Sequence, residues 1–281
     1  MPQVQWFPGH MSKTLKELKE EVKKVDIVFE LVDARIPISS RNPEIEKIIQ
    51  NKYHLIILNK CDLANPEKTK RWKEYFKSQG IYSIDIDSLK KKNINKISNL
   101  AYEILKPLNE KRKAKGLKEA SVKALIVGIP NVGKSTLINA LNNKKSCKTG
   151  DKPGVTKTNQ WIKVNEKLNL LDTPGVLWPK FENKDAGLKL SLIGSIKDDI
   201  LPLDEVVHFG FKYLYDNHKK QFFEKYSFEI EEFDINTIYY KIAEKRGCFL
   251  KNQIADIERI NRLFLKDFRS NCFGGITLDE E

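Results

Sequence analysis

The chain has 281 residues, and its 50 Lys and Arg against 38 Asp and Glu give a formal net charge of +12. Hydrophobic residues make up 40% and charged residues 31%, which supplies enough apolar side chains for a core and excludes a wholly disordered protein. The length exceeds that of one ordinary core, so one large domain or two smaller ones are expected. The positive charge fits a polyanionic partner, either nucleic acid or an acidic membrane, and it fits a surface of solvated lysines equally well.

The cysteines and the apolar runs indicate where in the cell the protein is located. None of the four cysteines stands in a C-x-x-C pair, which argues against a structural zinc site and against a disulfide framework. The first residues lack the pattern of a secretory signal, and the longest apolar runs have only the length of a strand. We therefore expect a soluble, reduced, cytoplasmic protein with no membrane partner.

Strand and helix patterns alternate along the first part of the chain. Ser12 is expected to cap a first helix. Four later runs are typical of buried parallel strands: 27–32, 55–58, 81–86 and 122–127. The segments between them carry helical spacing, except for a basic linker expected over 106–123, and 161–164 with 168–171 form a predicted hairpin. This alternation predicts a doubly wound α/β fold with a mostly parallel sheet.

After residue 175 the apolar residues follow helical spacing only, which predicts a second, smaller all-α domain. Residues 274–281 carry no core signal, and we expect this end of the chain to fray. The last helical segment carries basic residues that are candidates for contact with RNA, or that simply face solvent: Arg259, Arg262, Lys266 and Arg269.

Residues 128–135 match the phosphate-loop pattern G-x-x-x-x-G-K-[ST], between a predicted strand and a predicted helix. Its glycines let backbone N–H groups surround a phosphate at a helix N-terminus. Lys134 would neutralise the β- and γ-phosphate oxygens, and the Ser135 hydroxyl would ligate Mg²⁺. Further nucleotide contacts are expected from Asn131, Val132, Gly133 and Thr136. The sequence therefore predicts a nucleoside triphosphate site.

The segment Asn59-Lys60-Cys61-Asp62 follows a predicted strand, at the end where α/β sheets bind ligands. The Asp62 carboxylate can accept both the N1–H and the 2-amino group of guanine, whereas adenine would leave it unpaired, a discrimination of roughly a thousandfold. Lys60 would lie along the base, and Asn59 would tie this base loop to the phosphate loop. Alone, such a tetrapeptide is usually a turn, but beside a phosphate loop it predicts GTP. Asp87 and Ser88 are expected at the edge of the base.

Two further segments are expected to read the γ-phosphate. Asp172, after the predicted strand 168–171, would hold Mg²⁺ through a water, and the Gly175 N–H would bond the γ-phosphate. Loss of that bond on hydrolysis would release the segment. Thr156, in the polar stretch before the hairpin, would close onto Mg²⁺ in the triphosphate state.

The base loop precedes the phosphate loop, which reverses the order of an ordinary small GTPase, while a cyclic shift keeps neighbours together in space. This order, together with Trp-Phe-Pro-Gly-His-Met at residues 6–11, resembles the circularly permuted GTPases, most closely the ribosome biogenesis GTPase A (RbgA/YlqF) group. The resemblance covers nearly the whole chain. It implies a P-loop GTPase domain, expected over 1–178, and a smaller helical RNA- or ribosome-binding domain, expected over 179–281. Because the cyclic shift makes the segment after Gly175 lead straight into the helical domain, we hypothesise that its movement on hydrolysis reorients that domain.

Val176 stands where many GTPases carry a Gln that orients the attacking water, so another group must act here. The resemblance implies His10, whose imidazole suits that role near neutral pH; the alternative is an exposed histidine with no role. His54, His208 and His218 are expected to be structural or surface residues. The resemblance also favours K⁺ beside Asn131, although an Asn at this position is equally explained by its tolerance of unusual backbone angles.

The resemblance implies a GTP-hydrolysing assembly factor for the large (50S) ribosomal subunit, which binds rRNA or the pre-subunit in a nucleotide-dependent way and is monomeric away from it. A second hypothesis is an RNA-binding scaffold with a degenerate nucleotide site, against which the intact Lys134, Ser135, Asp172 and Asp62 argue. A third is a signalling or membrane-associated GTPase, against which the lack of a lipidation motif argues.

Overall fold

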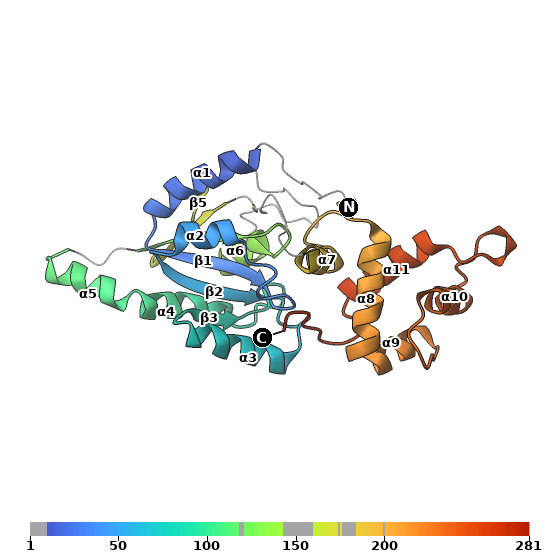
Figure 1. Ribbon diagram of the computed structural model, residues 1–281. Coiled ribbons are helices and arrows are strands. Elements are labelled where there is room, and N and C mark those ends of the chain that lie inside the picture. Colours follow the sequence, from blue (N-terminus) through green and yellow to red (C-terminus); the bar gives the residue numbers. More distant parts are fainter. Residues whose placement is uncertain are drawn as a thin grey trace. The chain divides into compact units, whose positions relative to one another are not determined.

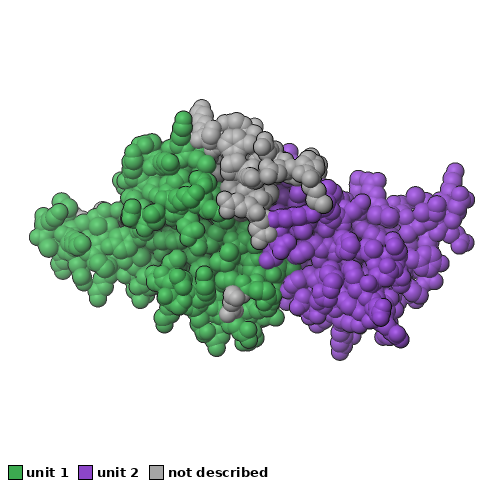
Figure 2. All heavy atoms as spheres, in the orientation of Figure 1, with its two compact units in different colours: residues 1–181, 277–281 green, residues 182–276 purple. Residues whose placement is uncertain are grey.

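The computed structural model describes residues 10–117, 121–142, 160–173, 175, 184–198 and 200–280, with backbone only for residues 10–14. The chain divides into two units, which Figure 2 distinguishes by colour. We call residues 1–181 with 277–281 the sheet unit, and residues 182–276 the helical unit. The predicted domain boundary, between residues 178 and 179, lies outside the described residues.

The sheet unit is built on six strands in the order β3-β2-β1-β4-β6-β5 (Figure 1). Five of them are parallel: β1 (Ile27–Asp33), β2 (Tyr53–Asn59), β3 (Tyr82–Asp85), β4 (Val122–Gly128) and β6 (Leu168–Asp172). The edge strand β5 (Gln160–Asn165) pairs with β6 in antiparallel fashion, which is the predicted hairpin. All seven residues of β1 are buried, so both faces of the sheet are covered, and this is why the strand sequences are almost continuously apolar.

Helices supply that cover. On one face, α1 (His10–Lys23) and α2 (Pro43–Ile49) pack Leu18, Val22 and Ile45 against Val28 of β1 and Leu125 of β4. On the same face, α3 (Pro66–Ser78) packs its aromatic side chains on β2. The other helices of this unit are α4 (Ile94–Ile104), α5 (Lys106–Ala114) and α6 (Lys134–Asn142), and α6 contacts both α4 and strands β4, β5 and β6. The predicted doubly wound, mostly parallel α/β fold is confirmed.

Two local predictions in this unit are wrong. The first helix begins at His10, so Ser12 lies inside it and does not cap it. The expected linker begins with helix α5, which has no buried residue and therefore lacks the apolar stripe by which a helix is recognised in a sequence. Asparagines cap the helices that follow β1 and β2, because Asn42 accepts from the Glu44 N–H and Asn65 from the Lys68 N–H.

The helical unit contains α7 (Lys184–Leu192), α8 (Leu203–Asn217), α9 (Lys219–Tyr226), α10 (Ile235–Arg246), a 3₁₀ turn (Lys251–Gln253) and α11 (Ile257–Arg269). An aromatic core joins three of the helices, since the Phe211 ring centroid lies 4.5 Å from that of Phe264 and 5.5 Å from that of Phe222. The predicted all-α region is confirmed. No helix among the residues that the structure describes is long and apolar enough to cross a membrane.

We predicted that the end of the chain would fray, and this prediction is wrong. Residues Thr277, Leu278 and Asp279 are buried, and they hydrogen-bond to the sheet unit. The prediction was wrong because these residues are stabilised by partners far away in the sequence and carry no apolar pattern of their own.

Candidate nucleotide site

The predicted loops lie at one edge of the sheet. The register pairs Asp33 at the end of β1 with Asn59 at the end of β2, Leu31 of β1 with Gly128 of β4, and Ile126 of β4 with Asp172 of β6. The carboxyl ends of these parallel strands therefore meet, and this is where ligands bind in open α/β sheets.

The phosphate loop closes tightly at Gly133, where it meets the base loop. Gly133 adopts φ +104°, and a Cβ at this position would overlap Nδ2 of Asn59. Only glycine meets both conditions. Val132 before it is fully buried, and Ser135 and Thr136 lie in the first turn of α6. Asn131 has φ 56°, a left-handed conformation that asparagine tolerates better than most residues, so the backbone alone accounts for its presence.

Lys134 lies buried within this loop. Its Nζ donates to the carbonyl oxygens of Gly128 at 2.9 Å and Ile129 at 2.8 Å. Burial lowers the pKa of the ammonium to about 8, although the charge of Asp172 acts in the opposite direction. The buried ammonium has lost hydration, so an anion that binds in this loop would restore a partner for its charge.

The segment after β6 lies against the phosphate loop. A Cβ on Gly175 would be 2.8 Å from the Pro130 nitrogen and 2.9 Å from Lys134 Nζ. Asp172 is fully buried, and the neighbouring Thr173 hydroxyl donates to the Ile126 carbonyl at 2.7 Å. The Ser135 hydroxyl and the Asp172 carboxylate are hard oxygen donors, so they fit Mg²⁺.

Two side chains of the base loop hydrogen-bond to backbone carbonyls of the phosphate loop and so join the two loops. Asn59 Nδ2 donates to the Val132 carbonyl at 2.8 Å, and Lys60 Nζ donates to the Asn131 carbonyl at 2.8 Å. Asn59 Oδ1 in turn accepts from the Ser88 hydroxyl at 2.8 Å. The structure thus contains the expected tie through Asn59, and it brings the loops after β2, β3 and β4 into one hydrogen-bonded framework.

The remaining base-loop residues differ in their surroundings. The Asp62 carboxylate is partly exposed, with Oδ2 3.4 Å from Lys90 Nζ. Cys61 is buried, which raises the pKa of its thiol, and its N–H donates to the Ile86 carbonyl. Asp87 is buried and accepts from the N–H groups of Leu89 and Lys90, so its carboxylate shapes its own loop. The side chain of His10, and Thr156 and Val176, lie outside the described residues.

Sequence reasoning missed two charged residues beside the base loop. The fully buried Asp33 carboxylate accepts from Arg35 Nε at 2.9 Å and Nη2 at 2.8 Å, and Lys60 Nζ lies 3.1 Å from its Oδ2. Burial by itself would raise the pKa of Asp33, but the Arg35 and Lys60 charges and the Arg35 hydrogen bonds outweigh it, and the pKa lies well below its ordinary value. The available signal was a pair of charged residues directly after a buried strand.

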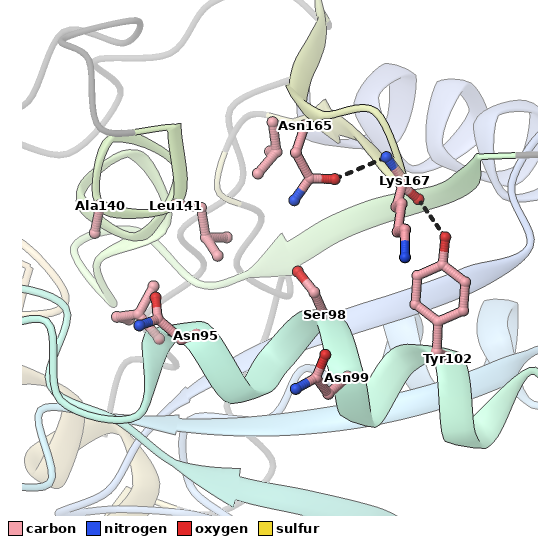
Figure 3. Close-up of a pocket in the computed structure, with 10 residues that line it drawn as sticks. Asn95, Ser98, Asn99, Tyr102, Ala140, Leu141, Asn165 and Lys167 are labelled. Atoms are coloured by element: carbon pink, nitrogen blue, oxygen red, sulfur yellow. Dashed lines mark hydrogen bonds between the residues drawn. The ribbon is translucent and has the colours of Figure 1, made fainter.

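A pocket of about 380 Å³ lies elsewhere in the sheet unit, between α4, α6 and the β5–β6 hairpin (Figure 3). Its polar wall comes from Asn95, Ser98 and Asn99 of α4, while the Tyr102 hydroxyl donates to the Lys167 carbonyl at 3.2 Å. The hairpin turn precedes β6, so the pocket is remote from the loops that follow the carboxyl ends of the strands.

Three basic residues of α11, Arg259, Arg262 and Arg269, have partners within the helical unit. Arg269 pairs with Asp198 at 2.6 Å and donates to the Ser191 and Leu192 carbonyls, which makes it a packing residue of this unit. Arg262 pairs with Glu258, and Arg259 donates to the Gly247 carbonyl. Lys266 is exposed.

Comparisons with known proteins agree with this geometry. A family model described as "50S ribosome-binding GTPase" matches residues 123–237. Ribosome biogenesis GTPase A of Bacillus pumilus is 45% identical over 277 residues, covering 99% of this chain and 98% of that protein. The Priestia megaterium protein of the same name is 46% identical, over 99% of this chain and 96% of that protein.

Solved structures of YlqF are similar as well. The GDP-bound structure matches with a TM-score of 0.67 at 26% identity, covering 94% of this chain and 98% of that one. GNP-bound YlqF from T. maritima matches with a TM-score of 0.66 at 26% identity, covering 95% and 98%. The chain therefore belongs to the ribosome biogenesis GTPase A (RbgA/YlqF) family of circularly permuted GTPases.

Proposed function

We propose that this chain hydrolyses GTP and that its nucleotide state controls its binding to a precursor of the large ribosomal subunit. The observation that carries the first part is the joined base loop and phosphate loop, in which Asn59 and Lys60 hold the Val132 and Asn131 carbonyls. Full-length similarity to proteins named ribosome biogenesis GTPase A supports the second part.

In this proposal the phosphate loop binds the β- and γ-phosphates through its backbone N–H groups and the buried Lys134 ammonium. Asp62 accepts from the guanine N1–H and 2-amino group, and Asn59 and Ser88 fix the loops around the base. Mg²⁺, held by Ser135, Thr156 and, through a water, Asp172, would neutralise charge on the phosphate oxygens. Gly175 reads the γ-phosphate through its N–H.

Water activation is assigned to His10, by family resemblance and because Val176 has no group that can orient water. A K⁺ ion beside Asn131 is a separate hypothesis, tested by comparing turnover in potassium and sodium at equal ionic strength. The domain division at 178/179, contact with rRNA through the helical unit, a monomeric free state and a cytoplasmic location also remain parts of the proposal.

The decisive experiment measures GTP hydrolysis by the purified chain with and without purified large ribosomal subunits. We expect slow turnover by the chain without subunits, because Val176 stands where many GTPases carry a water-orienting Gln. Purified subunits should raise the turnover at least about tenfold. Lys134→Ala is the control that removes phosphate binding. GTP binding without any hydrolysis in either condition would favour the scaffold hypothesis instead.

A further inference from the structure

The last four described residues, 277–280, which we call the C-terminal tail, bind the loop that follows β1. The Leu278 N–H donates to the Arg35 carbonyl at 2.7 Å. The buried Asp279 carboxylate accepts from the Ile38 and Ser39 N–H groups through Oδ2, both at 2.8 Å, and from the Ser39 hydroxyl through Oδ1 at 2.6 Å. A carboxylate that takes three hydrogen bonds in a buried position holds its loop firmly.

The tail also binds the segment that follows the base loop. The Asn65 N–H donates to the Thr277 hydroxyl at 3.1 Å. Lys68 Nζ donates to the Thr277 carbonyl at 3.3 Å and to Glu280 at 2.9 Å. Asn65 caps α3 and stands only three residues after Asp62, so the tail restrains the base loop from its C-terminal side.

A continuous set of polar contacts leads from the tail to the phosphate loop. Arg35, whose carbonyl accepts from the tail, donates to Asp33 through its guanidinium. Asp33 lies 3.1 Å from Lys60 Nζ, which also donates to the Asn131 carbonyl. These contacts connect the loop after β1 to Lys60, and through Lys60 to the phosphate loop.

We propose that the C-terminal tail is a positioning element of the nucleotide site, with Asp279 as its main positioning residue. This inference rests on the proposed guanine-nucleotide site and names how that site is regulated. The tail follows the helical unit in the chain, so a partner that binds the helical unit and draws the tail away weakens nucleotide binding. By linkage, bound nucleotide strengthens the attachment of the tail to the same degree.

The first test compares Asp279→Asn with Glu280→Gln. Both remove one negative charge from the tail, but Asp279 is buried whereas the Glu280 side chain is 74% exposed. We expect Asp279→Asn to raise the dissociation rate of fluorescently labelled GDP about tenfold, equivalent to about 1.4 kcal/mol. Glu280→Gln should change that rate less than about twofold, as expected for an exposed pair. Rates are measured well below the unfolding temperature of each variant.

The second test uses the unaltered protein and separates positioning from mere structural support. Hydrogen exchange is followed at the Leu278, Ile38 and Ser39 amides, with and without saturating GDP. Linkage requires GDP to raise the protection of these amides by about the factor by which the attached tail raises the affinity for GDP. A tail that only supports the fold would either exchange at the same rate or be slowed by GDP only as much as the amides of the sheet unit that exchange only through global unfolding, because bound ligand slows all of those equally.

The outcomes are distinguishable. Slower exchange with GDP, by about the factor that linkage requires, together with faster GDP release from Asp279→Asn, supports the proposal. Unchanged exchange at these amides, or slowing equal to that of the globally exchanging amides, overturns it, even if Asp279→Asn fails to fold and its release rate cannot be measured. If the unaltered chain binds no guanine nucleotide, the proposed function itself fails.

Discussion

Lys134 is the residue whose protonation most directly affects anion binding. Burial lowers the pKa of its ammonium to about 8, and a triphosphate favours the charged form, so above that pH the residue must take up a proton when nucleotide binds. We expect the affinity for GTP to be constant below about pH 8 and to fall above it, by up to about tenfold per pH unit. Titration of labelled GTP at constant ionic strength measures this.

GMP is the matched control for this prediction, because it carries the same base but lacks the β- and γ-phosphates that Lys134 would meet. Its affinity should depend on pH less steeply than that of GTP. Equal slopes for the two nucleotides would assign the effect to the base and not to Lys134.

Asp62 gives a second prediction at this scale. In Asp62→Asn an NH₂ group replaces one acceptor oxygen and faces the 2-amino group of guanine, donor against donor. The affinity for GTP should fall roughly a thousandfold, while xanthosine triphosphate, with an acceptor at that position, should bind better. Competition against labelled GDP measures both, with the exposed Asp216→Asn in the helical unit as control. A loss for GTP without any gain for the xanthine nucleotide would show that Asp62 does not face the base.

The sequence predicted individual residues where a motif prescribes a contact, and failed where the contact arises only in the fold. Asn59 was expected to meet the phosphate loop, and it donates to Val132. Asp33 and Arg35 were missed, because a charged pair after a strand looks the same in sequence whether it is buried or solvated. The Asp87 carboxylate accepts from the N–H groups of its own loop, which no motif prescribed, and its expected place at the edge of the base stays a prediction.

At the scale of elements, the loops after β2 and β4 depend on each other because they pack together at Gly133. In Gly133→Ala the added Cβ would overlap Asn59 Nδ2, so the Asn59–Val132 bond should break and GDP affinity should fall by at least about tenfold. Gly80→Ala is the control, since Gly80 also has positive φ (+72°) but open space around the added Cβ. Gly80→Ala should lower the unfolding temperature without lowering the affinity for GDP. Equal loss of GDP affinity in both variants would mean that backbone strain alone is responsible.

Buried strands were the elements most accurately predicted from sequence. The strand expected over 122–127 is found at Val122–Gly128, because a strand covered on both faces must be apolar along its whole length. Helix α5 was missed because it buries nothing, and the C-terminal tail because its partners, such as Ser39, stand 240 residues away. Both cases depend on tertiary position and not on local pattern.

At the scale of the whole molecule, a change in motif order leaves the architecture intact. The base loop comes first in the chain and the phosphate loop later, yet β2, β1, β4 and β6 are neighbours and present their loops along one edge. The sequence predicted this arrangement because it depends only on strand pairing. It did not predict that the chain would cross into the helical unit and return, which makes residues 182–276 an insertion within the sheet unit.

This return has a consequence for how the protein is made. Residues 277–280 belong to the sheet unit but are synthesised only after the whole helical unit. While they remain in the exit tunnel of the translating ribosome, the bonds from Asp279 to Ile38 and Ser39 cannot form. The helical unit has already been synthesised when residues 277–280 leave the tunnel, so it can fold before them. The unit that begins the chain therefore cannot finish folding until the helical unit has been synthesised.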